Sequence, residues 1–160
     1  MNLVDRVSRF ANRRGLYLGR RSARIHVWLY RHSGGRLGGH LPGNPKARIA
    51  LVDHVGARSG KLRTSPLIYH EQNDVVAVVA VVASKAGQPT HPAWFHNLVA
   101  NPDTTLQIGR EVHAVRARVA SDDERRRLWP ALTAVYPGYE FFAQLAKGRT
   151  IPVVLLAPRP

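Results

Sequence analysis

The sequence predicts an α+β fold built on a small, mostly antiparallel β-barrel that is closed or half-closed. The chain has 160 residues, the usual length of one domain with its own core. About six short apolar segments follow one another in its C-terminal two thirds, with few helices between them. Their connections are short, which favours antiparallel neighbours, and closing such a small sheet hides its edges.

The strands are recognised by apolar and β-branched residues between turn residues. The longest apolar run extends from Val75 to Ala83, far short of the roughly 20 residues that a membrane-spanning helix needs, so we interpret it as a buried strand. Pro66 lies inside the second segment and predicts a sheet edge or a bulge there. The expected strands cover residues 49–55, 64–70, 75–83, 104–108, 112–119 and 151–156.

Apolar residues at helical spacing predict helices that flank the barrel. Residues 2–13 are expected to form a short, basic amphipathic helix, and a second helix carries Ile25 and Trp28. Ser121 and Glu124 have the spacing of a capping box, which opens a helix. The other expected helices cover residues 92–99 and 139–146.

A Gly-rich stretch, SGGRLGGHLPGNP, occupies residues 33–45 and is expected to hold no regular structure. It divides the chain into a basic N-terminal segment, residues 1–45, and a barrel domain, residues 46–160.

The chain carries a net charge of +14, with most of its 24 Lys and Arg residues being Arg. Such an excess predicts an anionic partner, which can be nucleic acid, an anionic membrane surface or a polyanionic cofactor. The absence of Cys excludes disulfides, thiolate catalysis and Cys-based zinc sites. We expect a cytoplasmic protein, with peripheral contact to the inner face of the cell membrane through residues 1–32 left open.

The segment GARSGKLR, residues 56–63, connects the first two expected strands through a tight turn. Arg58, Lys61 and Arg63 place three cations beside the Ser59 hydroxyl, a grouping that suits a phosphate or a carboxylate. It is not a P-loop, because its glycines are one residue too close and it leads into a strand. A solvated basic hairpin is the alternative that the spacing leaves open.

Two more groups of residues can carry chemistry. Ser84 and Lys85 directly follow the buried strand, where ligands often bind. Tyr136 and Tyr139, together with Phe142, line one face of a short helix and can form the wall of an apolar pocket, with packing alone as the alternative. The eight His residues show no metal-ligand spacing, so no metal site is predicted.

Residues 26–160 resemble the deazaflavin (F420)-dependent nitroreductase family of actinobacteria. The resemblance rests on the ordered motifs YRHSGGRLGG, GARSGKLRTSPL, ASKAG, HPAWFHNLVANP, DDERRRLWPAL, VYPGY and RTIPVVLLAP. It implies a split β-barrel similar to FMN-binding proteins, with a positively charged groove that binds coenzyme F420. This cofactor carries a phosphodiester and an oligoglutamate tail, so it is the kind of polyanion that the composition calls for.

The resemblance also implies roles for individual residues. Tyr136 and Tyr139 match tyrosines of the substrate pocket and, with Ser84, are the expected catalytic residues. Phe142 and Ile68 stand where nitroreductase members carry Tyr, which predicts a more apolar pocket. The expected cofactor-binding residues are Arg58, Ser59, Gly60, Lys61, Arg63, Ser65, Pro66, Ser84, Lys85, Gly87, Trp94 and Asn97.

The predicted function is therefore that of an F420-dependent oxidoreductase, which transfers hydride from the reduced deazaflavin to an apolar quinone, enone or nitro-type substrate. The alternatives are a non-catalytic F420-binding protein, FMN or haem binding on the same barrel, and nucleic-acid or anionic-membrane binding. Nucleic acid is disfavoured, because the aromatic residues lie in apolar helical contexts rather than between basic residues on strands. A homodimer is left open.

Overall fold

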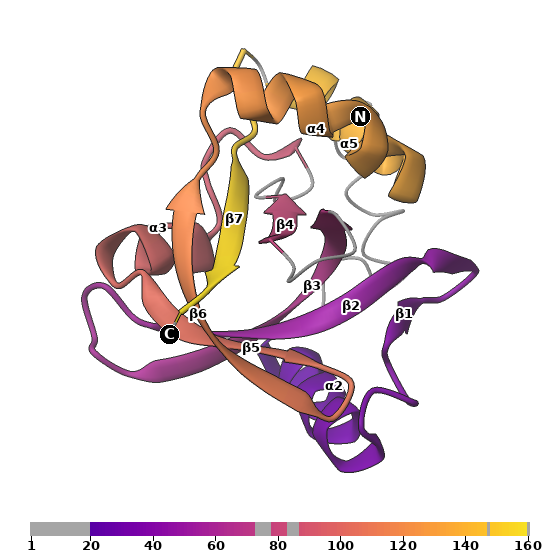
Figure 1. Cartoon of the computed structure of the whole chain (residues 1–160), viewed down its shortest axis with the longest axis vertical. Coiled ribbons are helices and arrows are strands. Elements are labelled where there is room, and N and C mark those ends of the chain that lie inside the picture. Colours follow the sequence, from indigo (N-terminus) through magenta and orange to yellow (C-terminus); the bar gives the residue numbers. More distant parts are fainter. Residues whose placement is uncertain (1–19, 73–77, 83–86, 147, 160) are drawn as a thin grey trace.

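The computed structural model describes residues 20–72, 78–82, 87–146 and 148–159. Its long strands are β2 (Asn44–Val55), β3 (Leu62–Gln72), β4 (Val78–Val82), β5 (Asp103–Ile108), β6 (Glu111–Val119) and β7 (Val153–Pro158). They are hydrogen-bonded in the order β2-β3-β4-β7-β6-β5, and a further pairing of β5 with β2 closes the barrel (Figure 1). Every pairing is antiparallel, which confirms the predicted architecture.

The Gly-rich stretch of residues 33–45 does contain regular structure, and the expectation for it was wrong. A short strand, β1 (His40–Leu41), pairs with β2, and β2 itself begins at Asn44. One glycine here serves a close backbone contact. A Cβ at Gly39 would lie 2.1 Å from the carbonyl oxygen of Gly35, so no other residue fits. The division of the chain at residue 45 stays a prediction.

The side chains of β2 alternate between the barrel interior and its outer face. Ala50 and Val52 belong to the interior core, together with Trp94 and Leu98 of α3 (Ala93–Ala100). The outward-facing residues of β2 instead pack against α2 (Arg20–Ser33), in a cluster made of Val27, Tyr30, Ile49, Leu51 and Ile68.

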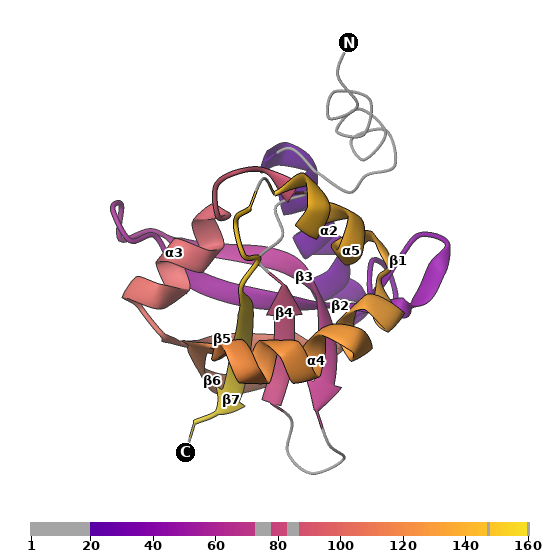
Figure 2. The ribbon, with the colours of Figure 1, turned by 90° about the horizontal axis from the view of Figure 1, so that it is seen from above.

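Two further helices, α4 (Asp122–Val135) and α5 (Gly138–Leu145), lie together against the outer face of β7 (Figure 2). The capping box of α4 is confirmed, because the Ser121 hydroxyl accepts from the Glu124 N–H and the Glu124 carboxylate accepts from the Ser121 N–H. No helix in the described part of the chain is long and apolar enough to cross a membrane.

Pro66 lies on β3, where it is paired with Leu51 of β2. The described pairing of β3 with β4 runs from Tyr69 to Gln72, so the edge or bulge that Pro66 indicates stays a prediction. The expected helix of residues 2–13 lies outside the described residues.

Tyr30 fastens α2 to the barrel. Its buried hydroxyl donates to the Ile49 carbonyl oxygen at 2.9 Å and accepts from the Gly109 N–H at 2.9 Å. One side chain thus satisfies two backbone groups, one on β2 and one at the β5–β6 turn.

Replacing Tyr30 with Phe should lower the free energy of unfolding by about 1–3 kcal/mol, because both backbone groups lose their partner. Urea denaturation measures this difference. Trp28→Phe is the matched control, since Trp28 is an exposed aromatic residue on the same helix, and its effect should stay within about 0.5 kcal/mol. Equal stability of Tyr30→Phe and wild type would contradict this role.

Candidate functional site

The hairpin between β2 and β3 presents the predicted cationic residues beside α3 (Figure 1). Arg58, Lys61 and Arg63 are all exposed. Six arginines elsewhere are paired with carboxylates, but none of these three cations forms an ion pair within the described ranges. Gly60 has a φ of 63° and its N–H donates to the Gly56 carbonyl oxygen at 2.8 Å, which closes the turn. The tip therefore concentrates positive charge that no carboxylate in the described part of the chain neutralises.

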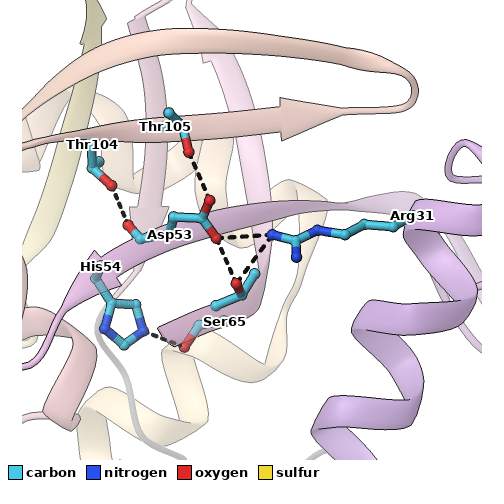
Figure 3. Close-up of polar contacts among 7 residues, drawn as sticks. Arg31, Asp53, His54, Ser65, Thr104 and Thr105 are labelled. Carbon is cyan, nitrogen blue, oxygen red and sulfur yellow. Dashed lines mark hydrogen bonds and ion pairs between the residues drawn. The ribbon is translucent and has the colours of Figure 1, made fainter. Parts of the chain in front are cut away.

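The two faces of this hairpin have different surroundings. The register pairs His54 with Arg63 and Val52 with Ser65, and residues directly opposite one another share a face. His54, Arg63 and Ser65 thus lie on the face that carries the interior residues of β2. Asp53 lies on the other face, toward α2 (Figure 3).

A chain of hydrogen bonds ties the inner face of the hairpin to α3. The Ala57 N–H donates to Asn97 Oδ1 at 2.9 Å, and Asn97 Nδ2 lies 2.9 Å from His54 Nδ1. His54 Nε2 in turn lies 2.9 Å from the Ser65 hydroxyl oxygen. His54 and Asn97 are only 4% and 7% exposed, so these contacts replace water as partners of buried polar groups.

Burial and, to a smaller extent, the nearby Arg63 guanidinium lower the pKa of His54 to about 4, although Asp53 opposes this shift. The imidazole is therefore neutral near neutral pH. A neutral ring can accept a hydrogen bond at one nitrogen and donate at the other, which is what its two partners require.

On the opposite face, Asp53 joins four elements of the fold. Its carboxylate accepts from Arg31 of α2 at 3.0 Å, from Thr64 of β3 at 2.5 Å and from Thr105 of β5 at 2.8 Å. Its backbone carbonyl oxygen accepts from the Thr104 hydroxyl (Figure 3). Because all of these donors come from the chain, we assign Asp53 a structural role.

Tyr136 and Tyr139 form an aromatic group at α5, remote from the hairpin in both views (Figures 1 and 2). Their rings lie 5.0 Å apart, and Phe142 lies 6.1 Å from Tyr136. Burial raises the pKa of both tyrosines, so their hydroxyls keep their protons at neutral pH. Phe142 and Ile68 both belong to hydrophobic clusters.

Gly87 connects the segment after β4 to this aromatic group. It is buried with a φ of 73°, and a Cβ there would lie 2.7 Å from Leu145 Cβ and 2.8 Å from the Phe142 carbonyl oxygen. Only glycine fits this close approach to α5. Ser84 and Lys85 lie outside the described residues.

The structure thus gathers the predicted site residues into two groups. Arg63, Ser65 and Asn97 surround His54, while Gly87 and the two tyrosines meet at α5. A cavity of about 300 Å³ lies elsewhere, and no predicted site residue lines it. It is lined by Leu98, Val99, Pro102, Arg116, Ala117, Arg118, Val119 and Val154.

The family model described as F420H(2)-dependent quinone reductase matches residues 22–158. The chain belongs to this family. Its members are F420-dependent oxidoreductases, so the predicted resemblance, the enzyme class and the cofactor F420 are confirmed. The family description also names a quinone as the acceptor, which is one of the substrates predicted from the sequence.

Individual relatives agree with this family. The F420H(2)-dependent quinone reductase Rv1261c of Mycobacterium tuberculosis is 34% identical over 155 residues, which cover 96% of this chain and 99% of the relative. A solved F420-H2 dependent reductase, FDR-A, is 38% identical with a TM-score of 0.61, covering 68% of this chain and 92% of its own. A structure described as a domain-swapped dimer is 32% identical with a TM-score of 0.63, covering 83% and 94%.

His54 of this quinone reductase family member was not among the site residues predicted from its sequence. The segment LVDHV shows a His in an otherwise apolar strand, directly before the cationic turn. Strand alternation places it on the same face as Ala50 and Val52, which was a usable indication that it is buried. Trp94, which the resemblance assigns to the cofactor site, packs in the barrel core and is 8% exposed. No three His, Asp or Glu residues are grouped to hold a metal in the described ranges.

The lowered pKa of His54 predicts a pH-dependent stability. In the unfolded chain His54 takes up a proton as the pH falls below its usual pKa of 6.5. In the folded chain it does so only at about pH 4. The contribution of this pKa difference to the free energy of unfolding is therefore complete above pH 6.5, and it is lost as the pH falls toward 4. Urea denaturation at about pH 7 and about pH 4.5 should show a larger loss for wild type than for His54→Asn.

The control for this experiment is His40→Asn, because His40 is exposed. The free energy of unfolding of His40→Asn should fall with decreasing pH as steeply as that of wild type. A His54→Asn variant that loses as much stability as wild type over this interval would contradict the assignment.

Proposed function

We propose that this protein reduces an apolar quinone, or an enone or nitro compound, with hydride from reduced F420 whose acidic tail binds at the β2–β3 hairpin. The observation that carries the proposal is the set of exposed cations Arg58, Lys61 and Arg63 without a carboxylate partner in the described ranges. A phosphodiester and an oligoglutamate chain supply several anionic groups for such a cluster. FMN has one phosphate and needs fewer cations, so it is the less suitable ligand.

The separation of the hairpin from the aromatic group suits an extended cofactor, with its tail at one group and its ring toward the other. Ser65 and Pro66 follow the hairpin along β3, and Gly87 comes two residues after Lys85 in the sequence. We assign these residues to cofactor contacts between the two ends. When bound, reduced F420 supplies the hydride, while the protein orients it and excludes water.

A quinone that receives hydride also needs a proton on its oxygen. Tyr136 is half-buried at the aromatic group, and its hydroxyl, whose pKa burial raises, carries its proton at neutral pH. Tyr139 is more deeply buried, at 5% exposed, so Tyr136 is the preferred donor and Tyr139 its packing partner. Ser84 remains the proposed hydrogen-bond donor to the developing negative charge.

Titration of the full chain with F420, FMN and NADPH tests the binding part of the proposal. F420 should bind most tightly, and the double variant Arg58→Gln/Lys61→Gln should weaken it about tenfold or more, because two charge-assisted contacts are lost. Arg126→Gln/Arg127→Gln removes the same charge from α4 and should leave binding unchanged. Equal weakening by both double variants would mean that only net charge matters.

Oxidation of reduced F420 with menaquinone, and separately with a nitroimidazole, tests the catalytic part. Tyr136→Phe should slow turnover about a hundredfold with little change in F420 affinity, whereas Tyr139→Phe should affect turnover less. Tight binding of F420 without oxidation by any acceptor would instead establish the non-catalytic alternative.

A second candidate function is contact with an anionic membrane surface through α2. Its outer face exposes Ile25 at 60% and Trp28 at 57%, and the preceding Arg21 and Arg24 are also exposed. The opposite face of the helix packs on the barrel, whereas on this face Trp28 contacts the ring of His32 of the same helix, with centroids 4.3 Å apart. Exposed Trp and aliphatic residues flanked by arginines are typical of an interfacial helix.

Co-sedimentation of the full chain with anionic and with zwitterionic vesicles tests this candidate. Wild type should bind anionic vesicles, and Ile25→Ser/Trp28→Ser should lose most of that binding, while Val112→Ser, at an apolar residue that is 62% exposed on β6, should not. Equal binding of all three proteins would exclude the α2 stripe. If the stripe instead joins two copies, sedimentation velocity will show a wild-type dimer that the double variant lacks.

A further inference from the structure

We propose that His54 is a positioning residue for the cofactor site: its imidazole occupies a lone pair of the Ser65 oxygen and thereby directs the Ser65 O–H away from the ring, to donate to an oxyanion beside Arg63. The inference rests on the proposed function, because it deepens the assignment of the hairpin to the anionic part of F420. It concerns a buried residue that the reaction itself does not use.

The direction of every hydrogen bond in this chain follows from one backbone group. The Ala57 N–H can only donate, so the Asn97 atom that faces it at 2.9 Å is the amide oxygen. The other end of that amide is the NH₂ group, which can only donate to His54 Nδ1. His54 Nδ1 therefore carries no proton.

The single proton of the neutral imidazole consequently lies on Nε2, and it is donated to the Ser65 oxygen at 2.9 Å. Ser65 then acts as acceptor toward His54, and its own proton needs another acceptor. No such acceptor lies within hydrogen-bonding distance among the residues that the structure describes. The lowered pKa of His54 agrees with this neutral form.

The surroundings of Ser65 indicate which ligand would take that proton. Ser65 is half-buried on β3, two residues after Arg63 and on the same face of the ladder as Arg63 and His54. A hydroxyl donor beside a guanidinium favours an oxyanion, because both groups then make charge-assisted hydrogen bonds to it. In F420 the phosphodiester is the oxyanion nearest the ring system, so we assign Ser65 to the phosphate.

Because the chain of bonds also reaches Ala57 at the start of the turn, His54 links two parts of the site. Asn97 of α3 holds the turn in place through Ala57, and His54 connects Asn97 to Ser65 of β3. The competing explanation is a buried histidine that serves stability alone. The two explanations differ in whether the His54 imidazole affects the binding of the ligand's phosphate.

Two amide variants distinguish the role of His54 Nε2 from that of His54 Nδ1. A Gln amide extends about as far as Nε2 and can still donate to Ser65, whereas an Asn amide ends near Nδ1 and leaves Ser65 without that donor. F420 affinity is measured by fluorescence titration for wild type, His54→Gln, His54→Asn and Ser65→Ala. The control ligand is the deazaflavin riboside that lacks the phosphodiester and the glutamate tail.

We expect His54→Asn and Ser65→Ala each to weaken F420 about tenfold, and the double variant His54→Asn/Ser65→Ala to be no weaker than either. His54→Gln should bind nearly as wild type does. The riboside should bind all of these proteins equally, a pattern that loss of stability alone would not produce. Equal weakening of both ligands, or additive effects in the double variant, would overturn the inference.

A measurement on the wild-type protein covers the case in which a His54 variant does not fold. Imidazole ¹⁵N shifts at neutral pH should show the proton on Nε2 of His54, and Ser65→Thr should restore the F420 affinity that Ser65→Ala loses. A proton on Nδ1 would overturn the inference. Failure of wild type to bind F420 at all would instead refute the proposed function.

Discussion

The pairing of β2 with both β3 and β5 is the constraint on which the rest of the fold depends. It closes the barrel, and closure gives β2 one face toward the barrel interior and one face toward its exterior. Strand alternation then assigns neighbouring residues to different environments. Asp53 faces α2 and holds four elements together, while the adjacent His54 faces inward, toward Asn97.

The same closure explains why the hairpin can carry function. Its strands are fixed by the barrel and its turn is fixed to α3 through Asn97, so the cationic tip projects from a rigid base. Six arginines elsewhere are paired with carboxylates, but Arg58, Lys61 and Arg63 have no carboxylate partner in the described part of the chain. Positive charge that is held in place and left unpaired is suited to an anionic ligand.

Local signals in the sequence were sufficient for much of this structure. The capping box at Ser121, the two strands of residues 104–108 and 112–119, and the hairpin at residues 56–63 each depend on residues close together in the chain, and each was found. The stretch around Gly39 was misjudged, because its glycine permits a contact with Gly35 that composition does not reveal. The partnership of His54 with Asn97 spans 43 residues, so no local pattern contains it.

Amide hydrogen–deuterium exchange with and without F420 tests the central claim most directly. If the acidic part of the cofactor binds at the β2–β3 hairpin, exchange should slow at residues 56–65 and in α3, which is tied to the turn, while the β5–β6 turn at Gly109 stays unchanged. Protection that spares the hairpin and appears only elsewhere on the barrel would contradict the account.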